Sequence, residues 1–462
     1  MRNKNVACWA LLLLTHASAV LFSRGYFQFD EHYQVLEFIQ WKLGAIATLD
    51  MPWELRARMR PWLHPLLFFP LEWLSHRWLG WSPFVKTTLH RACVAALALF
   101  AISRRTKRRP ALLGLYACLF YFPFLDVRMS AEVIGGWLFA LADALEEEER
   151  QSRPAAEFAR AVLFGLAAVI RLQVLAMWFG SWLFHLRQRE FQRCFWLAFG
   201  LLTAFGLAAL CDRWGYGAFS FVPWNYVYEN LVLGKAVRFG SGASPWFGYI
   251  TALLEKTGYL PGAIFLAALV WQWLRRPLDK LSFISAPFVF LHVAVAHKEL
   301  RFLFPLAPFM PQMIFDLWRD VRRLLVARYI AGAFVAANLV LLAPAALHDA
   351  DSDVGLYAAL YEYPVTTSNV LQYVKNTNPL RPYGLHPSYY VDPSLRARPL
   401  RSARKPWHGL LMFDDVPAFA AMRAEARCLL VASRYPSFIL DRWPRWLERG
   451  RWLNLWSLWR CP

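Results

Sequence analysis

The sequence predicts an all-α, multi-pass membrane bundle followed by a small C-terminal α/β domain. Of its 462 residues, 58% are hydrophobic and 17% are aromatic, which is more apolar than a single soluble core requires. The apolar residues fall in windows long enough to cross about 30 Å of hydrocarbon. Basic residues gather in short clusters between these windows, as in cytoplasmic membrane loops. We therefore assign the formal charge of +19 to membrane topology and expect no nucleic-acid partner.

Apolar windows predict eleven membrane-spanning helices. The first begins after Arg2 and Lys4 like a signal peptide, but its apolar residues continue through Phe22, which favours an uncleaved helix. The stretch 158–184 is interrupted by Arg171, so we expect two short helices that form a hairpin there. With the hairpin counted as two, the predicted spans lie near 6–22, 83–102, 111–125, 131–145, 158–184, 192–211, 258–274, 281–296, 302–318 and 326–345.

The basic clusters also predict the orientation, because Lys and Arg are retained on the cytoplasmic side. Eleven crossings place four basic connections on the side of the N-terminus: 104–109, 187–193, 275–280 and 319–328. The opposite compartment then receives the C-terminal tail and the loops at 24–80, 126–130, Arg171, 212–257 and 297–301. The arginines of the long loop 24–80 depart from the charge rule, which long loops follow poorly.

We divide the chain into a membrane domain, 1–346, and a soluble extracytoplasmic domain, 347–462. In the membrane domain, the mixture of Trp, Leu and charge in the first external loop is typical of interfacial helices. The central external loop spans 212–257. After residue 346 the apolar windows stop, and we expect short strands and helices.

Two features are singled out in the C-terminal domain. Its segments 409–413 and 429–431 are expected to form buried strands. Cys428 and Cys461 both lie there, and a disulfide between them is allowed if the compartment is oxidising.

An acidic pair follows the first apolar helix. Helical spacing puts Asp30, Gln34 and Glu37 on one face. A carboxylate presented in this way can accept a proton from an alcohol, which is the task of a general base. From this fragment alone, an alternative is equally open: Asp30 or Glu31 caps the start of a helix, where an acid favours the helix dipole.

A second polar segment, residues 297–302, reads His-Lys-Glu-Leu-Arg-Phe and lies between two apolar windows. Ionisable residues at the mouths of membrane helices are costly to keep there, which indicates a reaction or transport site. On a helical turn, Lys298 and Arg301 would converge on one anion such as a phosphate. His297 would then donate a hydrogen bond and Glu299 would orient a basic side chain. The alternative is a cluster of long side chains that snorkel to the membrane interface.

No metal or cofactor is expected from the sequence. No Cys and His spacing matches a zinc site, no glycine-rich phosphate loop follows a strand, and no Gly-x-Ser-x-Gly turn occurs. The external loops contain no Asn-x-Ser/Thr acceptor, which favours a bacterial source.

These segments resemble the dolichyl-phosphate-mannose-dependent mannosyltransferases of the glycosyltransferase 22 family. Residues 297–302 match that family's His-Lys-Glu-x-Arg-Phe motif at every fixed position. Residues 30–37 are similar to its first-loop motif, particularly in the branch that adds the third mannose to glycosylphosphatidylinositol anchors. The block 128–132 and parts of 212–249 resemble further family segments, so the likeness spans about 1–320.

The resemblance implies a GT-C fold and assigns roles to residues. Asp30 would be the catalytic base, and Glu31 would help to position the substrate. His297, Lys298 and Arg301 would hold the donor phosphate, with Glu299 beside them. Phe29 departs from the family, which usually has proline there. Weaker substrate-binding candidates are Gln34, Arg128, Glu132, Arg171, Asp212, Tyr216, Asn225 and Trp246.

The implied function is inverting transfer of a mannosyl or other hexosyl residue from a polyprenyl-phosphate sugar to a glycolipid or lipid-linked glycan. The product would be an α-mannoside made without metal or cofactor. The site would face away from the cytoplasm, in a bacterial inner membrane or alternatively in the endoplasmic reticulum. Two other classes stay open: a secondary transporter and a non-catalytic lipid-binding membrane protein. A transporter would place its polar groups near the middle of the membrane in repeated halves, and no such repeat occurs.

Overall fold

The computed structural model divides the chain into two compact units. Unit 1 comprises Met1–Ser23, Trp53–Pro70 and Thr88–His348, and unit 2 comprises Arg24–Pro52, Leu71–Thr87 and Asp349–Pro462. Unit 2 thus combines pieces of the first external loop with the C-terminal part of the chain, a grouping that the sequence did not predict. The residues described are 2–148, 153–239, 242–350, 353–362, 371–373, 380, 385–392, 395, 397–399, 409–413, 427–433 and 457–461.

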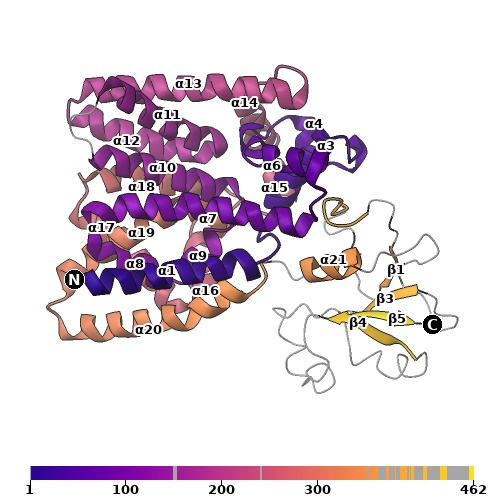
Figure 1. The fold of residues 1–462 in the computed structure, drawn as a ribbon. Coiled ribbons are helices and arrows are strands. Elements are labelled where there is room, and N and C mark those ends of the chain that lie inside the picture. Colours follow the sequence, from indigo (N-terminus) through magenta and orange to yellow (C-terminus); the bar gives the residue numbers. More distant parts are fainter. Residues whose placement is uncertain are drawn as a thin grey trace. The chain divides into compact units, whose positions relative to one another are not determined.

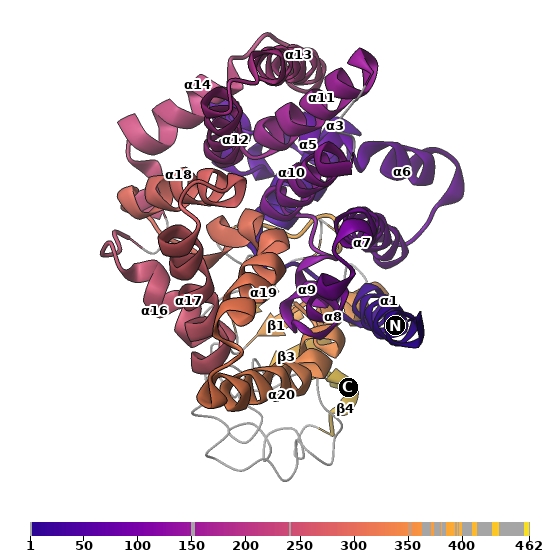
Figure 2. The same cartoon turned by 90° about the vertical axis from the view of Figure 1, so that its left-hand side faces the viewer.

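Unit 1 is a bundle of helices, many of which run alongside one another (Figure 1), and several of these are seen nearly end-on in Figure 2. Helix α7 (Pro83–Arg108) begins in unit 2 and continues through unit 1, and α6 (Phe69–Leu74) also contributes to both. The remaining long helices of unit 1 are α1 (Arg2–Phe22), α10 (Ala131–Glu148), α11 (Pro154–Ile170), α12 (Leu175–Arg187), α13 (Phe191–Tyr216), α17 (Tyr259–Arg275), α18 (Lys280–Ala294), α19 (Met310–Val321) and α20 (Leu325–Leu347). Its shorter helical segments are α4 (Trp53–Ala57), α5 (Leu63–Leu66), η4 (Pro110–Leu112), α8 (Leu113–Cys118), α9 (Tyr121–Leu125), η5 (Leu172–Val174), α14 (Val222–Val227), η6 (Tyr228–Val232), α15 (Lys235–Phe239), α16 (Gly248–Thr257) and η7 (Leu300–Phe309).

Four helices in the described part of the chain are long and apolar enough to cross a membrane by themselves. They are α1, α7, α13 and α20, at the positions of the predicted spans near 6–22, 83–102, 192–211 and 326–345. The predicted hairpin is also confirmed, because α11 ends at Ile170 and α12 begins at Leu175, with the break at Arg171. The count of eleven spans stays a prediction.

Two predicted continuous helices are interrupted, and the predictions are wrong there. The window 302–318 forms the 3₁₀ segment η7 followed by α19. Pro305 and Pro308 lie inside η7 and lack the N–H groups that an α-helix needs, so a regular α-helix cannot continue there, whereas Pro311 lies in the first turn of α19, where a missing N–H is tolerated. The window 111–125 forms the short helices α8 and α9, because Leu119 adopts an extended conformation between them.

Small residues allow the bundle helices to pack closely. A Cβ atom on Gly180 of α12 would lie 1.8 Å from the carbonyl oxygen of Phe283 in α18. A Cβ atom on Gly200 of α13 would lie 2.3 Å from the carbonyl carbon of Ala161 in α11. Such backbone contact is typical of membrane helices, which gain stability from van der Waals packing rather than from a hydrophobic effect between them.

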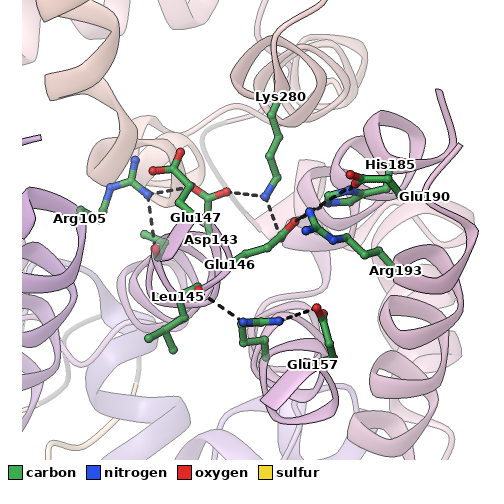
Figure 3. Close-up of polar contacts among 12 residues, drawn as sticks. Arg105, Asp143, Leu145, Glu146, Glu147, Glu157, His185, Glu190, Arg193 and Lys280 are labelled. Atoms are coloured by element: carbon green, nitrogen blue, oxygen red, sulfur yellow. Dashed lines mark hydrogen bonds and ion pairs between the residues drawn. The ribbon is translucent and has the colours of Figure 1, made fainter. Parts of the chain in front are cut away.

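The basic connections meet at one end of unit 1 (Figure 3). Lys280 lies 2.7 Å from Asp143 and 2.9 Å from Glu146, both in α10. His185 of α12 lies 2.8 Å from Glu146, and Arg105 of α7 lies 2.9 Å from Asp143. A further pair, Arg276–Asp320 at 2.9 Å, joins the 275–280 connection to the end of α19. The connections that the charge rule placed on one side therefore lie together.

Unit 2 contains a helical run and a mixed sheet. The run consists of α2 (Phe29–Glu31), the π-helical turn η1 (His32–Leu36) and α3 (Glu37–Lys42); the other helical segments are η2 (Thr48–Asp50), η3 (Ser75–Leu79) and α21 (Asp353–Glu362). The strands lie in the order β2-β1-β3-β5-β4, with β1 parallel to β2 and β3, and β5 antiparallel to β3 and β4. Their bounds are β1 (Leu371–Tyr373), β2 (Ala397–Pro399), β3 (Gly409–Phe413), β4 (Leu429–Ser433) and β5 (Ser457–Cys461).

The strands predicted at 409–413 and 429–431 are confirmed as β3 and β4. Strand β4 is not buried, because its side chains are partly or largely exposed and Leu429 is 72% exposed. Cys428, directly before β4, is disulfide-bonded. The side chain of Cys461 lies outside the described residues. That 347–462 is a separate soluble domain stays a prediction, and much of this range also lies outside the described residues.

Candidate active site

The loops predicted to be external meet at one end of unit 1. His64 Nε2 donates to the carbonyl oxygen of Met129 at 2.8 Å. Gln173, just after the break at Arg171, donates to the hydroxyl of Tyr226 at 2.6 Å. The backbone N–H of Ser244 donates to the carbonyl oxygen of Ala296 at 2.9 Å. Segments far apart in the sequence are therefore brought to the same place as residues 297–302.

The segment 297–302 is not a single helical turn. Glu299 is extended (φ −131°, ψ 139°), and the 3₁₀ segment η7 begins only at Leu300. Lys298 lies before it and donates to the carbonyl oxygens of Val295 at 2.5 Å and Ser244 at 3.4 Å. The prediction that Lys298 and Arg301 converge from one helical turn is therefore wrong.

Glu299 instead organises this segment. Its Oε2 accepts from Arg301 Nε at 2.7 Å, and its Oε1 lies 2.8 Å from His297 Nε2. The hydrogen bond from Glu299 raises the pKa of His297 above its ordinary value, against the opposing effect of burial. The carboxylate thereby fixes the orientation of two basic side chains and favours the protonated form of one of them.

Glu132, at the start of α10, joins this cluster from another helix. Its Oε1 lies 3.0 Å from Arg171 and 3.7 Å from Arg301, and all three side chains are buried. Both guanidinium groups also lie 5.2 Å from the centre of the Phe302 ring. The side chains of Arg171, Lys298 and Arg301 carry three positive charges against the two carboxylates, before His297 is counted. A surplus of positive charge is suited to an anion.

The remaining external candidates in unit 1 hold the backbone of other loops. Arg128 is almost fully buried and donates to the carbonyl oxygen of Ser23 at 2.6 Å, at the end of α1.

Asp212 accepts from the backbone N–H of Trp62 at 2.7 Å. Tyr216 donates to the carbonyl oxygen of Arg60 at 2.7 Å, and Asn225 to that of Arg58 at 3.2 Å. Trp246 is 68% exposed.

In unit 2, the acidic pair has two different environments. Asp30 is partly exposed, and its Oδ1 accepts from Gln34 Nε2 at 2.8 Å, one helical turn later. Glu31 is 2% exposed. The ring of Phe29 stacks on Tyr33 at 4.2 Å between centroids. This contact supports the entry to the helix by packing.

The predicted shared face of Asp30, Gln34 and Glu37 is only half correct. The π-helical turn His32–Leu36 contains one more residue than an α-helical turn. Glu37 therefore does not lie on the face that α-helical spacing predicts. Glu37 Oε1 lies 2.8 Å from His32 Nε2 and accepts from the backbone N–H of Tyr389 at 3.0 Å. Glu37 therefore belongs to a buried cluster that also contains Glu72, which the sequence analysis missed because no local pattern marks it.

Residues near the cationic segment were also missed. His64 contacts the 126–130 loop, and burial lowers its pKa to about 4, so it is neutral near pH 7. Tyr249 is buried, and this burial raises the pKa of its hydroxyl above the ordinary value. Neither residue has a sequence signal of its own. In the described part of the chain, no three His, Cys, Asp or Glu side chains are grouped to hold a metal ion.

A family comparison gives this geometry its context. The model of the Alg9-like mannosyltransferase family matches residues 7–369. The chain belongs to the Alg9-like mannosyltransferase family. The family predicted from residues 30–37 and 297–302 is thus confirmed, and most of the C-terminal part of unit 2 lies beyond the match.

Three curated proteins similar to this chain are 24–29% identical to it over the matched parts. The GPI alpha-1,2-mannosyltransferase 3 of Mus musculus is 24% identical over 297 residues, covering 61% of this chain and 53% of the relative. The protein of the same name in Danio rerio is 29% identical over 183 residues, covering 38% and 32%. The GPI mannosyltransferase 3 of Aspergillus fumigatus is 26% identical over 251 residues, covering 46% and 30%. The matches thus span about half or less of the length of these relatives.

Solved structures identify the fold of this family member. ArnT from Cupriavidus metallidurans, in a crystal structure bound to undecaprenyl phosphate, superposes with a TM-score of 0.51 at 12% identity, covering 98% of this chain and 97% of ArnT. Its apo structure gives a TM-score of 0.52 at 13% identity, with the same coverage. At this identity the likeness concerns the fold alone. The predicted GT-C fold is confirmed, and the apolar helices make the chain an integral membrane protein.

Proposed function

We propose that the protein is an inverting mannosyltransferase that moves a mannosyl residue from a polyprenyl-phosphate sugar to a hydroxyl of a glycolipid or lipid-linked glycan. Family membership supports the class of reaction. The single observation that carries the site assignment is the buried cluster in which Glu299 and Glu132 orient Arg301 beside Arg171. The names of the curated relatives support a mannosyl transfer to a GPI-type lipid, and the lipid phosphate named in the ArnT structure supports a polyprenyl donor.

The cationic segment is assigned to the donor phosphate. Arg301 and His297 would donate to the phosphate oxygens, and Lys298 would add a further positive charge. Arg171 would add a positive charge beside Arg301, because Glu132 lies close to both guanidinium groups. As the bond between the sugar and the phosphate breaks, negative charge grows on the leaving oxygen, and fixed cations stabilise that change.

Asp30 is assigned as the general base. It is partly exposed, unlike its neighbour Glu31, so an acceptor hydroxyl can reach it. Gln34 donates to Oδ1 of Asp30 at 2.8 Å, which orients the carboxylate. Glu31 would help to position the substrate from its buried site.

The chemical step balances without a metal or cofactor. The acceptor oxygen forms a bond to the anomeric carbon of the sugar while its proton passes to Asp30. The bond between that carbon and the phosphate oxygen breaks at the same time, and its electron pair leaves with the polyprenyl phosphate. One displacement inverts the anomeric centre, so a β-linked donor gives an α-mannoside. This reaction would take place on the extracytoplasmic side of a bacterial inner membrane or, alternatively, on the lumenal side of the endoplasmic reticulum.

The weaker candidates receive supporting roles. Trp246 is exposed and offers a flat surface for a sugar or a lipid chain. Asp212, Tyr216, Asn225 and Arg128 would act through the loops whose backbones they hold.

A transfer assay tests the assignment. Purified protein in lipid nanodiscs receives radiolabelled polyprenyl-phosphate-mannose and a glycolipid extract, and labelled glycolipid is measured. Asp30→Asn should lower kcat by at least about 100-fold with little change in donor KM. Arg301→Lys should raise the donor KM by about tenfold or more, because lysine cannot keep the two-nitrogen contact by which Glu299 orients Arg301.

Matched controls remove an equivalent group elsewhere. Asp50→Asn changes an exposed acid of unit 2, and Arg319→Lys changes an arginine that is 53% exposed in unit 1. Both should retain wild-type kinetics. Full activity of Asp30→Asn would refute its role as the base. Binding of the intact sugar lipid without transfer would favour a transporter or a lipid-binding protein.

A further inference from the structure

A buried polar cluster in unit 2 connects the helical run 29–42 to residues 385–392. Tyr389 donates through its hydroxyl to Glu72 Oε1 at 2.6 Å, and its backbone N–H donates to Glu37 Oε1 at 3.0 Å. Tyr33 donates to the carbonyl oxygen of Leu385 at 3.2 Å. These bonds join positions about 300 to 350 residues apart in the sequence.

Aromatic rings hold the residue that follows the acidic pair. His32 is completely buried and stacks between two tyrosine rings. Its centroid lies 5.0 Å from that of Tyr26 and 5.3 Å from that of Tyr390, with interplanar angles of 24° and 8°. Its Nε2 lies 2.8 Å from Glu37. His32 is two residues after Asp30, so fixing this ring fixes the direction in which the helix presents the Asp30 carboxylate.

The carboxylate that accepts from Tyr389 is itself held from other directions. Glu72 Oε2 accepts from Lys86 Nζ at 2.7 Å and from Gln40 Nε2 at 3.3 Å. The ammonium group of Lys86 lies 4.7 Å from the centre of the Tyr389 ring. Tyr389 therefore meets a hydrogen-bond acceptor at its hydroxyl and a cation on its ring face, and Glu72 also contacts the α3 residue Gln40.

The cluster is too well connected to serve only as packing. Glu37, Glu72 and Tyr389 are at most 6% exposed. Buried polar groups of this kind destabilise a protein unless their hydrogen bonds are satisfied in one geometry, so a satisfied network defines one arrangement of the segments that it joins. Here the segments are the helical run that carries Asp30 and a stretch beyond the family match, which ends at residue 369.

We propose that residues 385–392 form a positioning element for Asp30, with Tyr389 as the positioning residue. This inference rests on the proposed function, in which Asp30 is the general base. Tyr389 acts through Glu37 and Glu72 on the helical run 29–42 and does not touch the substrate. The C-terminal part of the chain is thereby given a role in the rate of the chemical step.

The test compares Tyr389→Phe with the wild-type full-length protein in nanodiscs. This change removes one hydroxyl and keeps the ring. We expect kcat to fall about 10- to 100-fold, because a small displacement of the Asp30 carboxylate would slow the chemical step. The donor KM should be unchanged. Tyr361→Phe is the matched control, because Tyr361 is a half-exposed tyrosine of α21 in the same unit. It should keep wild-type kcat.

A second measurement does not depend on activity. Hydrogen–deuterium exchange, followed by mass spectrometry, should show faster amide exchange in peptides covering 29–42 in Tyr389→Phe, and unchanged exchange in peptides from α13. A loss that reflects only poorer folding would lower the amount of active protein and speed exchange throughout the chain, and this result would overturn the proposal.

The remaining outcomes separate this inference from the proposed function. Unchanged exchange at 29–42, or faster exchange with unchanged kcat, would overturn the positioning role of Tyr389 while leaving Asp30 as the base. Full activity of Asp30→Asn would remove the base assignment whatever Tyr389→Phe does. In the Asp30→Asn background, Tyr389→Phe should cost little further activity, because both changes affect the same step.

Discussion

Glu132 and Arg171 form a buried ion pair, with Glu132 Oε1 3.0 Å from the Arg171 guanidinium. The pair joins the start of α10 to the break between α11 and α12. The same oxygen lies 3.7 Å from Arg301, so one carboxylate serves two arginines. The arrangement keeps positive charge in excess at the place proposed for the donor phosphate.

Replacing Glu132 with glutamine should destabilise the protein. The change leaves two buried guanidinium groups without one of their counter-charges, and breaking a buried pair in this way costs about 3–5 kcal/mol. The thermal midpoint of the detergent-solubilised protein measures the effect. Glu147→Gln, also in α10, is the control: its pair with Arg109 is more than one-third exposed and should contribute about 0–1 kcal/mol. Equal midpoints for the two variants would contradict the importance of the buried pair.

The pH dependence of activity should report His297. Its pKa is raised by Glu299, so the charged form persists above the ordinary value of 6.5. The contribution of the His297–Glu299 pair to the stability of the fold is therefore complete below pH 6.5. It is lost as the pH rises through the raised pKa of His297. Donor binding should weaken over the same range. In Glu299→Gln, the alkaline limb of kcat/KM should move to lower pH, whereas Glu255→Gln, at an exposed acid of α16, should leave it in place. An unmoved limb in Glu299→Gln would exclude His297 as its origin.

Two glycines of α13 should respond oppositely to alanine. A Cβ atom on Gly215 would lie 2.0 Å from the ring of Trp62, which is fully buried. Gly215→Ala should thus displace the 58–62 loop and destabilise the protein by about 1–3 kcal/mol or more. Gly206 has open space around it, so Gly206→Ala should be neutral or stabilise the helix by up to about 1 kcal/mol. Thermal midpoints would show this difference, and similar midpoints would argue against close packing of Trp62 on α13.

The network at the other end of unit 1 gives a further prediction. Lys280→Met leaves the buried Asp143 and Glu146 without a shared cation, and we expect a loss of about 3–5 kcal/mol. Arg187→Met removes an exposed cation from the same end and should have little effect. Denaturation of both variants in the same detergent checks the comparison. A tolerated Lys280→Met would mean that the remaining cations, Arg105 and Arg193, neutralise the two acids without it.

The sequence predicted the helices best where only length and apolarity decide. Helices α1, α7, α13 and α20 follow their windows closely because a long apolar run has few other stable forms in a membrane. The prediction of one helix over 302–318 failed because Pro305 and Pro308 remove α-helical hydrogen bonds, an effect that hydropathy does not register. Arg171, by contrast, marked its break correctly because a charge inside an apolar run is itself a strong signal.

The site was predictable in its residue types and less so in its geometry. The motif at 297–302 identified the cationic segment, but the path of Lys298 depends on Ser244, which lies 54 positions earlier in the sequence. Glu37 was placed beside Asp30 by helical spacing, yet its partner is Tyr389, 352 positions away. Such contacts depend on the tertiary fold, and the local spacing of residues in the sequence cannot predict them.

The π-helical turn His32–Leu36 has a consequence for comparing this chain with distant relatives. A turn of this kind arises when one residue is inserted into an α-helix, so the residues on its two sides differ by a single step in register. If a sequence alignment allows no one-residue gap between 32 and 36, it can align only one side of the turn correctly. Either the acidic pair or Glu37 is then aligned with the wrong residue of the relative. Relatives that lack the insertion would then seem to have lost a carboxylate that they in fact retain, and would be misjudged as inactive.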